Sequence, residues 1–391
     1  MTPAARTQAA IELLDLVIDA AREGGAAADV VVQRYFAARR YAGSKDRRAV
    51  RELVFAAIRA CGERPANGRA AVLALAEDDA ALAATFDGGP HAPAPIAAGE
   101  RPAKRGLAPK WLLEALRASG LDEGELPALV DRAPLDLRVN RLRADPADVA
   151  ARLPGAEPVA GLPDALRLSA GTDVTPLAGL VEVQDAGSQA VALAARAEPG
   201  ARVVDLCAGG GGKTLAIAAA MGNRGSVLAC DADRARLAKL PPRAEKAGAA
   251  IIETRLLDPG REVEALADWR EAADCVLVDA PCSGTGTWRR NPEARWRLTP
   301  ARLERLVETQ ARLLRVAAEL VRPGGALVHI VCSLLDAEGR AQAEIFLAEH
   351  PGWTAEALNL PLGRPHGAGL RLTPASDHSD GFFVARLVRP C

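Results

Sequence analysis

Hydrophobic positions follow two different periods, one in the N-terminal part of the chain and one after about residue 180. From residue 6 to about 85, apolar residues recur at helical spacing, as Ile11, Leu14 and Ile18 do, which predicts a bundle of helices. From Val181 onward, short apolar runs alternate with helical segments; the runs are 202–206, 226–230, 250–254, 275–278, 326–331 and 381–388. This alternation predicts an α/β fold with a doubly wound, mostly parallel sheet.

The intervening sequence carries weaker signals. Residues 88–106 are rich in Pro, Gly and Ala without periodicity, which indicates a linker. Beyond it we expect a helix from Pro109, a short helix after Asp122, a strand over 135–142, a helix after Asp145 and a strand over 165–169. The expected organisation is a helical domain (1–87), a linker (88–106), a small α+β module (107–180) and the α/β domain (181–391).

The third predicted helix begins beside a basic cluster. Ser44 suits the N-cap of this helix, with Asp46 in its first turn. In the segment 34–51, Asp46 is the single acidic residue, and there are seven basic residues: Arg34, Arg39, Arg40, Lys45, Arg47, Arg48 and Arg51. The cluster is either a solvated helix face or a contact for an RNA backbone.

Composition narrows the class of protein. A net charge of −1 over 391 residues means that any nucleic-acid surface is local. Seven cysteines without a CxxC pair argue against a disulfide framework or a zinc site. The N-terminus lacks the apolar core of a signal peptide, and no long apolar run occurs. We therefore expect a cytoplasmic protein that is not bound to a membrane and holds no metal.

A glycine-rich segment, 204–214, joins a predicted strand to a helix. A P-loop would need glycine where Cys207 stands, and a dinucleotide fingerprint would need a small residue where Thr214 stands. The remaining interpretation is a small cofactor with an adenosine end, whose ribose hydroxyls are held by Asp231 after the next strand. S-adenosylmethionine fits best.

Two cysteines stand at the ends of predicted strands. Asp279 closes the run 275–278 and is followed by Cys282, while Cys332 follows the run 326–331. Open α/β sheets bind ligands at the carboxyl ends of their strands. The pair therefore indicates thiol chemistry on a bound ligand.

These segments together resemble the Nol/Nop/Sun family of RNA cytosine-C5 methyltransferases, and most of all its bacterial RsmB (Fmu/Sun) branch. The resemblance rests on DLCAGGGGKT (205–214), DAPCSGTG (279–286), RRNPEARW (289–296), RPGG (322–325) and VCS (331–333). It covers roughly residues 130–390. It implies a Rossmann-like class I methyltransferase domain dependent on S-adenosyl-L-methionine, and more weakly a NusB-like RNA-binding helical domain at the N-terminus.

The resemblance also implies roles for individual residues. Cys332 would attack C6 of cytosine and Cys282 would assist breakdown of the adduct, although DNA enzymes of this chemistry attack with the cysteine of the Pro-Cys pair, here Cys282. Asp279 would contact the N3/N4 edge of the base, and Lys213 would lie near the cofactor or the base. Cofactor contacts are expected from Cys207, Ala208, Gly209, Gly210, Gly211, Gly212, Lys213, Asp231, Asp258 and Asp279.

RNA contacts are expected from Arg138, Asn140, Arg289 and Arg290, with a plain solvated strand as the alternative for the first two. The function implied is methylation of a cytosine in small-subunit (16S) ribosomal RNA, as part of rRNA processing, by a monomer. A transfer-RNA substrate, or a weakly catalytic RNA-binding assembly factor, are the alternatives.

Overall fold

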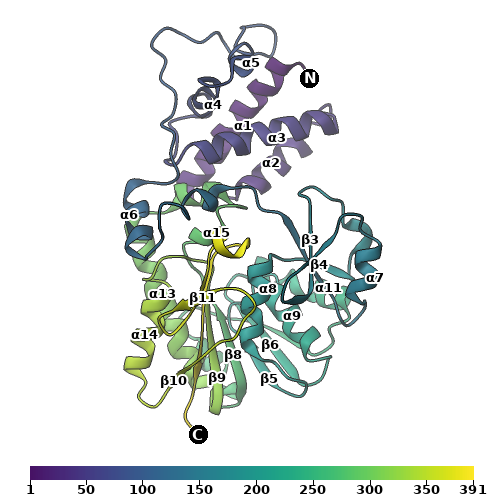
Figure 1. The fold of residues 1–391 in the computed structure, drawn as a ribbon, viewed down its shortest axis with the longest axis vertical. Coiled ribbons are helices and arrows are strands. Elements are labelled where there is room, and N and C mark those ends of the chain that lie inside the picture. Colours follow the sequence, from purple (N-terminus) through teal and green to yellow (C-terminus); the bar gives the residue numbers. More distant parts are fainter. The chain divides into compact units, whose positions relative to one another are not determined.

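The computed structural model describes residues 1–391 and divides into two compact units. The first unit comprises 1–131 together with 287–299, and the second comprises 132–286 and 300–391. Each is described by itself, and the elements are labelled in Figure 1. The four-part organisation expected above stays a prediction.

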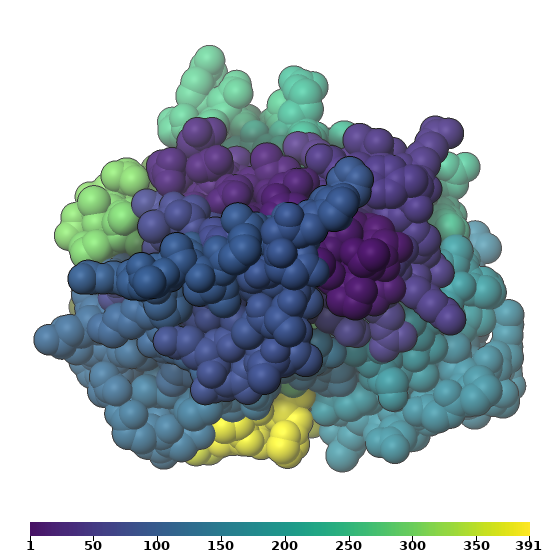
Figure 2. Space-filling model, turned by 90° about the horizontal axis from the view of Figure 1, so that it is seen from above, coloured from purple at the N-terminus to yellow at the C-terminus, as the bar shows by residue number.

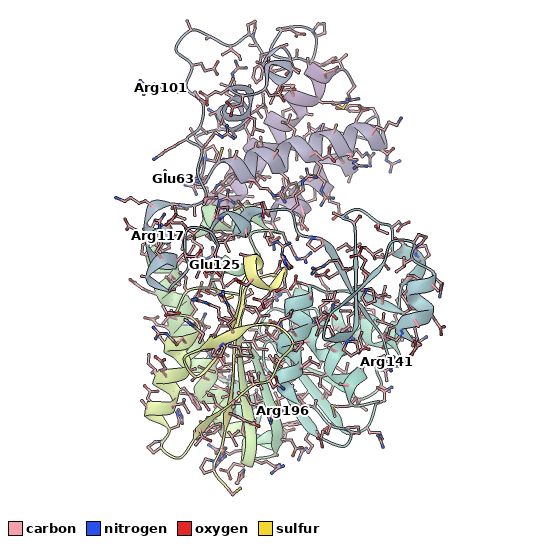
Figure 3. All side chains as sticks on the ribbon, viewed as in Figure 1. Glu63, Arg101, Arg117, Glu125, Arg141 and Arg196 are labelled. Carbon is pink, nitrogen blue, oxygen red and sulfur yellow. The ribbon has the colours of Figure 1, made fainter.

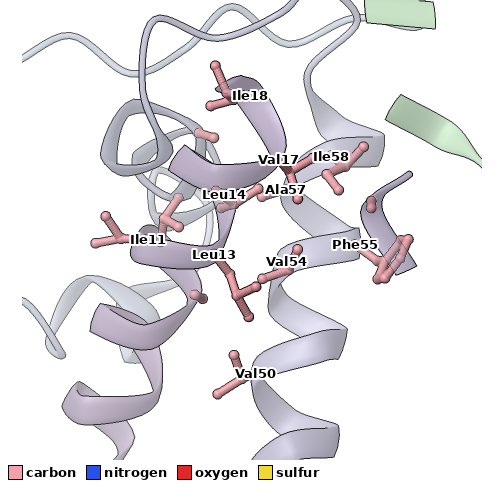
Figure 4. Packing of buried hydrophobic residues seen from close by; sticks show 14 of the residues in the cluster. Ile11, Leu13, Leu14, Val17, Ile18, Val50, Val54, Phe55, Ala57 and Ile58 are labelled. Atoms are coloured by element: carbon pink, nitrogen blue, oxygen red, sulfur yellow. The ribbon is translucent and has the colours of Figure 1, made fainter. Parts of the chain in front are cut away.

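The first unit is helical, as the 3.6-residue period predicted. Its elements are α1 (Pro3–Glu23), α2 (Ala28–Ala37), α3 (Ser44–Ala60), α4 (Gly68–Ala76), α5 (Ala80–Ala83), α6 (Lys110–Ala118) and the 3-10 turns η1 (Pro127–Val130) and η6 (Pro292–Arg297). The apolar stripe of α1, with Leu13 and Val17, packs against Val54 and Ile58 of α3 (Figure 4). Burial of these stripes is what stabilises helices of this length.

The start of α3 differs by one residue from the prediction. Gly43 is the N-cap and Ser44 is the first helical residue, without a capping hydrogen bond from its side chain. Asp46 does lie in the first turn. Its carboxylate accepts hydrogen bonds from the N-terminal ammonium at 3.1 Å and from Arg6 Nε at 2.8 Å, and these bonds hold the pKa of Asp46 below its usual value. Asp46 therefore ties the start of α1 to the start of α3.

Residues 88–106 form no helix or strand, yet they are attached to the helices. The amide of Ala103 donates to Ala70 O, and that of Gly106 donates to Ala60 O, both at 2.9 Å. Figure 2 shows the purple surface of α1 beside the blue surface of the chain that follows α4, consistent with their shared core.

Segment 287–299 belongs to the helical unit although it lies far along the sequence. Arg295 is fully buried and donates to the carbonyls of Ile58, Arg59 and Cys61 at the end of α3. A cation at a helix C-terminus satisfies carbonyls that have no partner inside the helix. Trp296 Nε1 also donates to Cys61 O, at 2.8 Å.

The second unit contains a small sheet and a large one. The small sheet has the order β2-β3-β1-β4 and is antiparallel. Its strands are β1 (Leu135–Val139), β2 (Glu157–Val159), β3 (Leu162–Leu168) and β4 (Val181–Val183), and α7 (Pro146–Ala151) and η2 (Thr175–Leu177) accompany them. The prediction of β1, β3 and α7 is confirmed, and the predicted Asp145 caps α7.

The large sheet has the order β11-β12-β13-β9-β8-β5-β6-β7, with β10 paired to β13. Its parallel strands are β5 (Arg202–Asp205), β6 (Ser226–Asp231), β7 (Ile252–Leu256), β8 (Ala273–Asp279) and β9 (Val321–Val331), and its antiparallel part comprises β10 (Thr354–Glu356), β11 (Arg364–His366), β12 (Gly369–Leu372) and β13 (Phe382–Val388). The order turns from one direction to the other between β5 and β8. Such a switch point opens a crevice at the carboxyl ends of the strands.

Helices cover both faces of this sheet (Figure 1). They are α8 (Ala186–Ala192), η3 (Leu193–Ala195), α9 (Gly212–Ala220), α10 (Arg234–Leu237), α11 (Leu240–Ala247), α12 (Glu262–Ala265), η4 (Ala267–Trp269), η5 (Thr285–Thr287), α13 (Pro300–Leu320), α14 (Arg340–Glu349) and α15 (Pro374–Asp377). Val204 and Val276 share a core with α13 and α14, whereas Val203 and Cys275 share one with α8 and α9. Successive side chains of each strand thus point to opposite faces of the sheet, and both faces are buried, which explains why these strands are apolar throughout.

The predicted doubly wound, mostly parallel fold is confirmed, and all six of its expected strands are present. β10, β11 and β12 were not predicted, because each is short and carries no apolar run. No helix combines the length and apolarity that a membrane crossing requires.

Truncating one core residue of α1 tests the packing of the helical unit. Leu14→Ala should lower the free energy of unfolding of this unit by about 2–5 kcal/mol, since Leu14 is fully buried. Calorimetry of the full chain measures the shift of the corresponding transition. Leu16→Ala on the same helix is the matched control, because Leu16 is 48% exposed and should change stability little; equal losses in the two variants would contradict the packing.

Candidate functional site

The site lies at the carboxyl ends of β5, β6, β8 and β9, in the second unit. Parallel pairing places the end of β5 beside β8, with Asp205 opposite Leu277. It also places β8 beside β9, with Asp279 opposite Ile330. The loops that follow these strands therefore meet at one edge of the sheet, where doubly wound folds bind their ligands.

The glycine-rich loop runs from β5 into α9. Gly209 and Gly211 have φ values of 55° and 87°, in the left-handed region that favours glycine. A Cβ at Gly211 would lie 2.2 Å from Leu240 Cδ1, so α11 packs directly on the loop. This loop contains all the predicted loop residues: Cys207, Ala208, Gly209, Gly210, Gly211 and Gly212. Because glycine has no side chain, a ligand can approach the backbone of the four glycines closely.

Asp231 is the last residue of β6, as expected for the acid that holds ribose hydroxyls. One carboxylate oxygen accepts from Gly209 N and the other from Asp233 N, both at 2.7 Å. Those bonds fix the orientation of the carboxylate beside the loop. Asp258 follows β7 and is exposed.

Asp205 is a further acid, at the end of β5, that the sequence analysis did not assign to the site. Its Oδ2 accepts from Thr214 Oγ1 at 2.7 Å, whereas its Oδ1 is buried without a protein partner. Burial raises the pKa of Asp205 to about 7, against the lowering effect of the Thr214 hydrogen bond. Its position at a strand end beside the glycines was the available signal.

Lys213 and Asp279 form an ion pair, with 2.7 Å between Nζ and Oδ2. Lys213 lies in the first turn of α9 and is only 8% exposed. Burial favours the neutral amine, but the charge and the hydrogen bond of Asp279 outweigh it, so the pKa of Lys213 is raised. The ammonium also lies 5.4 Å from the centre of the Phe382 ring. Lys213 is therefore charged, and the ion pair holds both side chains in place.

The two predicted cysteines are brought together. Cys282 Sγ and Cys332 Sγ are 3.3 Å apart, although 50 residues separate them in sequence. The hydrogen bond to Cys332 is the main cause that raises the pKa of Cys282 well above its usual value, followed by burial and by the charges of Cys332 and Glu338. Cys282 therefore retains its proton while Cys332 lies beside it.

A buried polar network lies behind the cysteines and was missed by the sequence analysis. Glu338 accepts from Ser283 N at 2.8 Å, Ser333 Oγ at 2.5 Å and Gln310 Nε2 at 3.1 Å, and also from Ser283 Oγ. Each serine directly follows one of the two cysteines in sequence. An acid six residues after Cys332 was visible in the sequence, but nothing there indicated that it would be buried.

The remaining predicted residues lie elsewhere. Arg138 is buried and its Nε donates to Gln184 Oε1 at 2.7 Å. Asn140 is also buried, and its amide donates to Gly179 O and Ala247 O. The Asn140 side chain is thus occupied within the fold, whereas Nη2 of Arg138 is buried without a hydrogen-bond partner, and the neighbouring Arg141 is exposed (Figure 3). Their contact with RNA remains a prediction.

Arg289 and Arg290 lie in the first unit, in segment 287–299. The basic cluster of 34–51 belongs to the same unit, on α2, α3 and the turn between them. Its exposed members are Arg34, Arg40, Lys45, Arg48 and Arg51. Tyr41, in the middle of this cluster, is 74% exposed.

Among all residues, no group of three or more His, Cys, Asp or Glu side chains is arranged to hold a metal ion.

Comparison with known proteins gives a consistent result. Residues 190–388 match the family model described as "16S rRNA methyltransferase RsmB/F". The chain is 39% identical over 299 residues to a probable ribosomal RNA small subunit methyltransferase B from Synechocystis, covering 71% of this chain and 66% of that one. It is 38% identical over 296 residues to ribosomal RNA small subunit methyltransferase B from Xylella fastidiosa, covering 72% and 68%.

The chain thus spans about two-thirds of the length of the curated relatives that it matches. Among solved structures, the crystal structure of PH0851 superposes with a TM-score of 0.78 at 24% identity and covers 99% of both chains. This likeness concerns the fold.

S-adenosyl-L-methionine is the cofactor of such methyltransferases, and the residues at the strand ends fit it. Asp231 offers a fixed carboxylate for ribose hydroxyls. The unpartnered Oδ1 of Asp205 is an acceptor at the buried end of the same loop. Acidic acceptors around a glycine loop suit a ligand that carries hydroxyls, an ammonium and a sulfonium.

Removing the charge of Asp231 tests this assignment. Asp231→Asn should weaken binding of S-adenosyl-L-methionine by about 1.5–3 kcal/mol, or roughly 10- to 100-fold, because hydrogen bonds to a charged group are lost. Isothermal titration calorimetry measures the dissociation constant. Asp233→Asn is the control, since this exposed residue only caps α10; unchanged affinity in Asp231→Asn would exclude a ribose contact.

Proposed function

Because the chain belongs to the RsmB/F family of 16S rRNA methyltransferases, we propose that it methylates C5 of a cytosine in small-subunit ribosomal RNA through a covalent bond between a cysteine and C6. The observation that carries this proposal is the pair of sulfurs 3.3 Å apart after the ends of β8 and β9, next to the switch point of the sheet. Such a site suits the addition of a thiolate to a base.

The chemistry explains why a thiolate is needed. C5 of cytosine is a poor nucleophile, and a thiolate that bonds to C6 moves the electrons of the C5–C6 double bond toward C5 and the N3 edge. S-adenosyl-L-methionine, when bound, supplies the methyl group that C5 takes. Loss of the C5 proton to a base then restores the double bond and expels the thiolate.

Cys332 is the nucleophile in this proposal and Cys282 is the base. At rest Cys282 holds its proton, because its hydrogen bond with Cys332 and the charge of that residue raise its pKa. Once Cys332 is bonded to C6, it no longer carries a negative charge, so both effects vanish. The pKa of Cys282 then falls, so Cys282 releases its proton to water, and the thiolate that remains accepts the C5 proton.

Asp279 and Lys213 hold the base. The Asp279 carboxylate accepts from the N4 amino group or a protonated N3, which favours electron flow into the ring after Cys332 attacks. Lys213 holds Asp279 in place through the 2.7 Å contact. The target base has to leave its stack to reach this buried edge, or to come from a single-stranded loop.

The basic cluster of α2 and α3 binds the RNA backbone. Its exposed arginines and Lys45 flank the exposed Tyr41 in sequence, a combination of charge and aromatic surface that suits an unpaired strand. Arg289 and Arg290, in the same unit, would add to it. The protein would act on this RNA as a monomer in the cytoplasm, where ribosomal RNA is processed.

Covalent trapping tests the roles of the cysteines. With Cys282→Ala, small-subunit RNA and S-adenosyl-L-methionine, a denaturation-resistant protein–RNA adduct should accumulate, because no base remains to release it. With Cys332→Ala no adduct should form. Denaturing gel electrophoresis with labelled RNA measures both.

The opposite pattern would make Cys282 the nucleophile. Cys61→Ala is the control, since this thiol is buried in the helical unit, and it should behave as the unmodified protein. Methyl transfer to transfer RNA alone would favour the alternative substrate. No transfer to any RNA would favour the assembly-factor alternative.

Neutralising two basic residues tests the RNA surface. Arg40→Ser/Lys45→Ser should reduce the slope of log affinity against log salt by about 1.4, at roughly 0.7 per backbone contact with single-stranded RNA. Filter binding at several salt concentrations measures the slope. Arg22→Ser/Lys110→Ser removes two exposed charges elsewhere on the unit, and an equal effect from this control would show that the cluster has no special role.

A further inference from the structure

Glu338 is a fully buried carboxylate for which the proposed chemistry has no direct use. It lies in the turn between β9 and α14, and its side chain forms no ion pair. An ionised carboxylate is costly to bury unless several donors replace water. Here a backbone amide, two hydroxyls and a side-chain amide do so. These four donors offset the cost of burying the carboxylate.

The donors show what Glu338 connects. Ser283 and Ser333 each directly follow a cysteine, and both hydroxyls donate to the same oxygen, Oε2. The other oxygen, Oε1, accepts from Ser283 N and Gln310 Nε2. One carboxylate therefore binds the residue that follows each cysteine: the amide and hydroxyl of Ser283, and the hydroxyl of Ser333.

Further bonds make the grip rigid. Gln310 of α13 also donates to Pro281 O at 2.9 Å, so it holds the residue on the other side of Cys282. Thr285 Oγ1 lies 3.1 Å from Ser333 Oγ and accepts from Leu334 N at 2.8 Å. The loops after β8 and β9 are thus joined behind the sulfurs by side-chain hydrogen bonds, in addition to the backbone bond from Gly286 N to Cys332 O at 3.1 Å.

We propose that Glu338 is a positioning residue for the proposed reaction: by bridging Ser283 and Ser333 it holds the sulfurs of Cys282 and Cys332 at reacting distance. This inference rests on the proposed function. Parallel pairing of β8 and β9 ends before the cysteines, so strand register alone does not set the separation of the sulfurs. Misplacement of reacting groups by about 1 Å costs roughly 100-fold in rate.

The charge of Glu338 also acts on Cys282 directly, by raising the pKa of its thiol. It is one of the causes that raise the pKa of Cys282, after the hydrogen bond to Cys332, burial and the charge of Cys332. Glu338 touches neither sulfur nor the base in this arrangement, and acts through the two serines and through its field.

Disulfide cross-linking with diamide measures the alignment of the sulfurs without RNA or methyl donor. Each sulfur loses one proton and one electron to diamide, which is reduced to the hydrazine as the S–S bond forms. Glu338→Ala should slow formation of the Cys282–Cys332 disulfide at least tenfold, measured by mass spectrometry of the folded protein. It should lower kcat by a similar factor and leave the affinity for S-adenosyl-L-methionine unchanged.

Conservative and partial variants separate positioning from stability. Glu338→Gln should restore cross-linking to within about threefold of the unmodified protein, because the amide oxygen can still accept from both serine hydroxyls, although its NH2 group cannot accept from Ser283 N. Ser333→Ala should slow it, and combining Ser333→Ala with Glu338→Ala should add no further loss, since both act through one network. The Ser333→Ala variant keeps the test decisive if Glu338→Ala does not fold.

Glu344→Gln on α14 is the matched control, because Glu344 is exposed, and it should change nothing. Cross-linking at the unmodified rate in folded Glu338→Ala and in Ser333→Ala would overturn the inference. Loss of alignment in a protein whose unmodified form transfers no methyl group would instead refute the proposed function alone.

Discussion

Parallel hydrogen bonding among β5, β8 and β9 is the constraint on which the site depends. It brings residues 205, 279 and 332 to one edge of a sheet although long helical connections separate them in sequence. The strand order reverses between β5 and β8. The glycine loop after β5 and the loop after β8 that carries Cys282 therefore diverge, and a crevice opens between them. The ends of the strands, rather than any single loop, determine which side chains can meet a cofactor and a base together.

The buried charges of this edge differ in how they are compensated. Asp279 and Lys213 form an ion pair, whereas Glu338 is held by neutral donors alone. His329, beneath this network, adds no opposing charge, because burial lowers its pKa to about 4, against the raising effect of its contact with Glu338 O. An uncompensated charge next to a pair of thiols distinguishes two otherwise similar sulfurs. It favours the proton on Cys282.

The sequence could predict those parts of the fold and the site that depend on local pattern. Apolar runs revealed the parallel strands, and the acids and thiols at their ends revealed the edge where they meet. The N-cap of α3 was wrong by one residue, because Gly43 occupies the cap and leaves Ser44 in the helix. Strands β10 to β12 escaped prediction because pairing, not composition, makes them strands. Glu338 and its serines escaped because burial of a polar residue is decided by tertiary contacts that no short pattern encodes.

Segment 287–299 follows the Cys282 loop directly in sequence, yet its side chains belong to the core of the helical unit. Arg295 and Trp296 complete that core from more than 200 residues away along the chain. A cut after residue 131 therefore does not yield two independent proteins. The N-terminal piece would lose the Arg295 guanidinium that bonds the last carbonyls of α3. The C-terminal piece would expose Arg295 and Trp296, whose partners lie in the other piece. The two units must therefore evolve together. Replacing the helical unit by another domain would also require changes in segment 287–299, which lies within the sequence of the second unit.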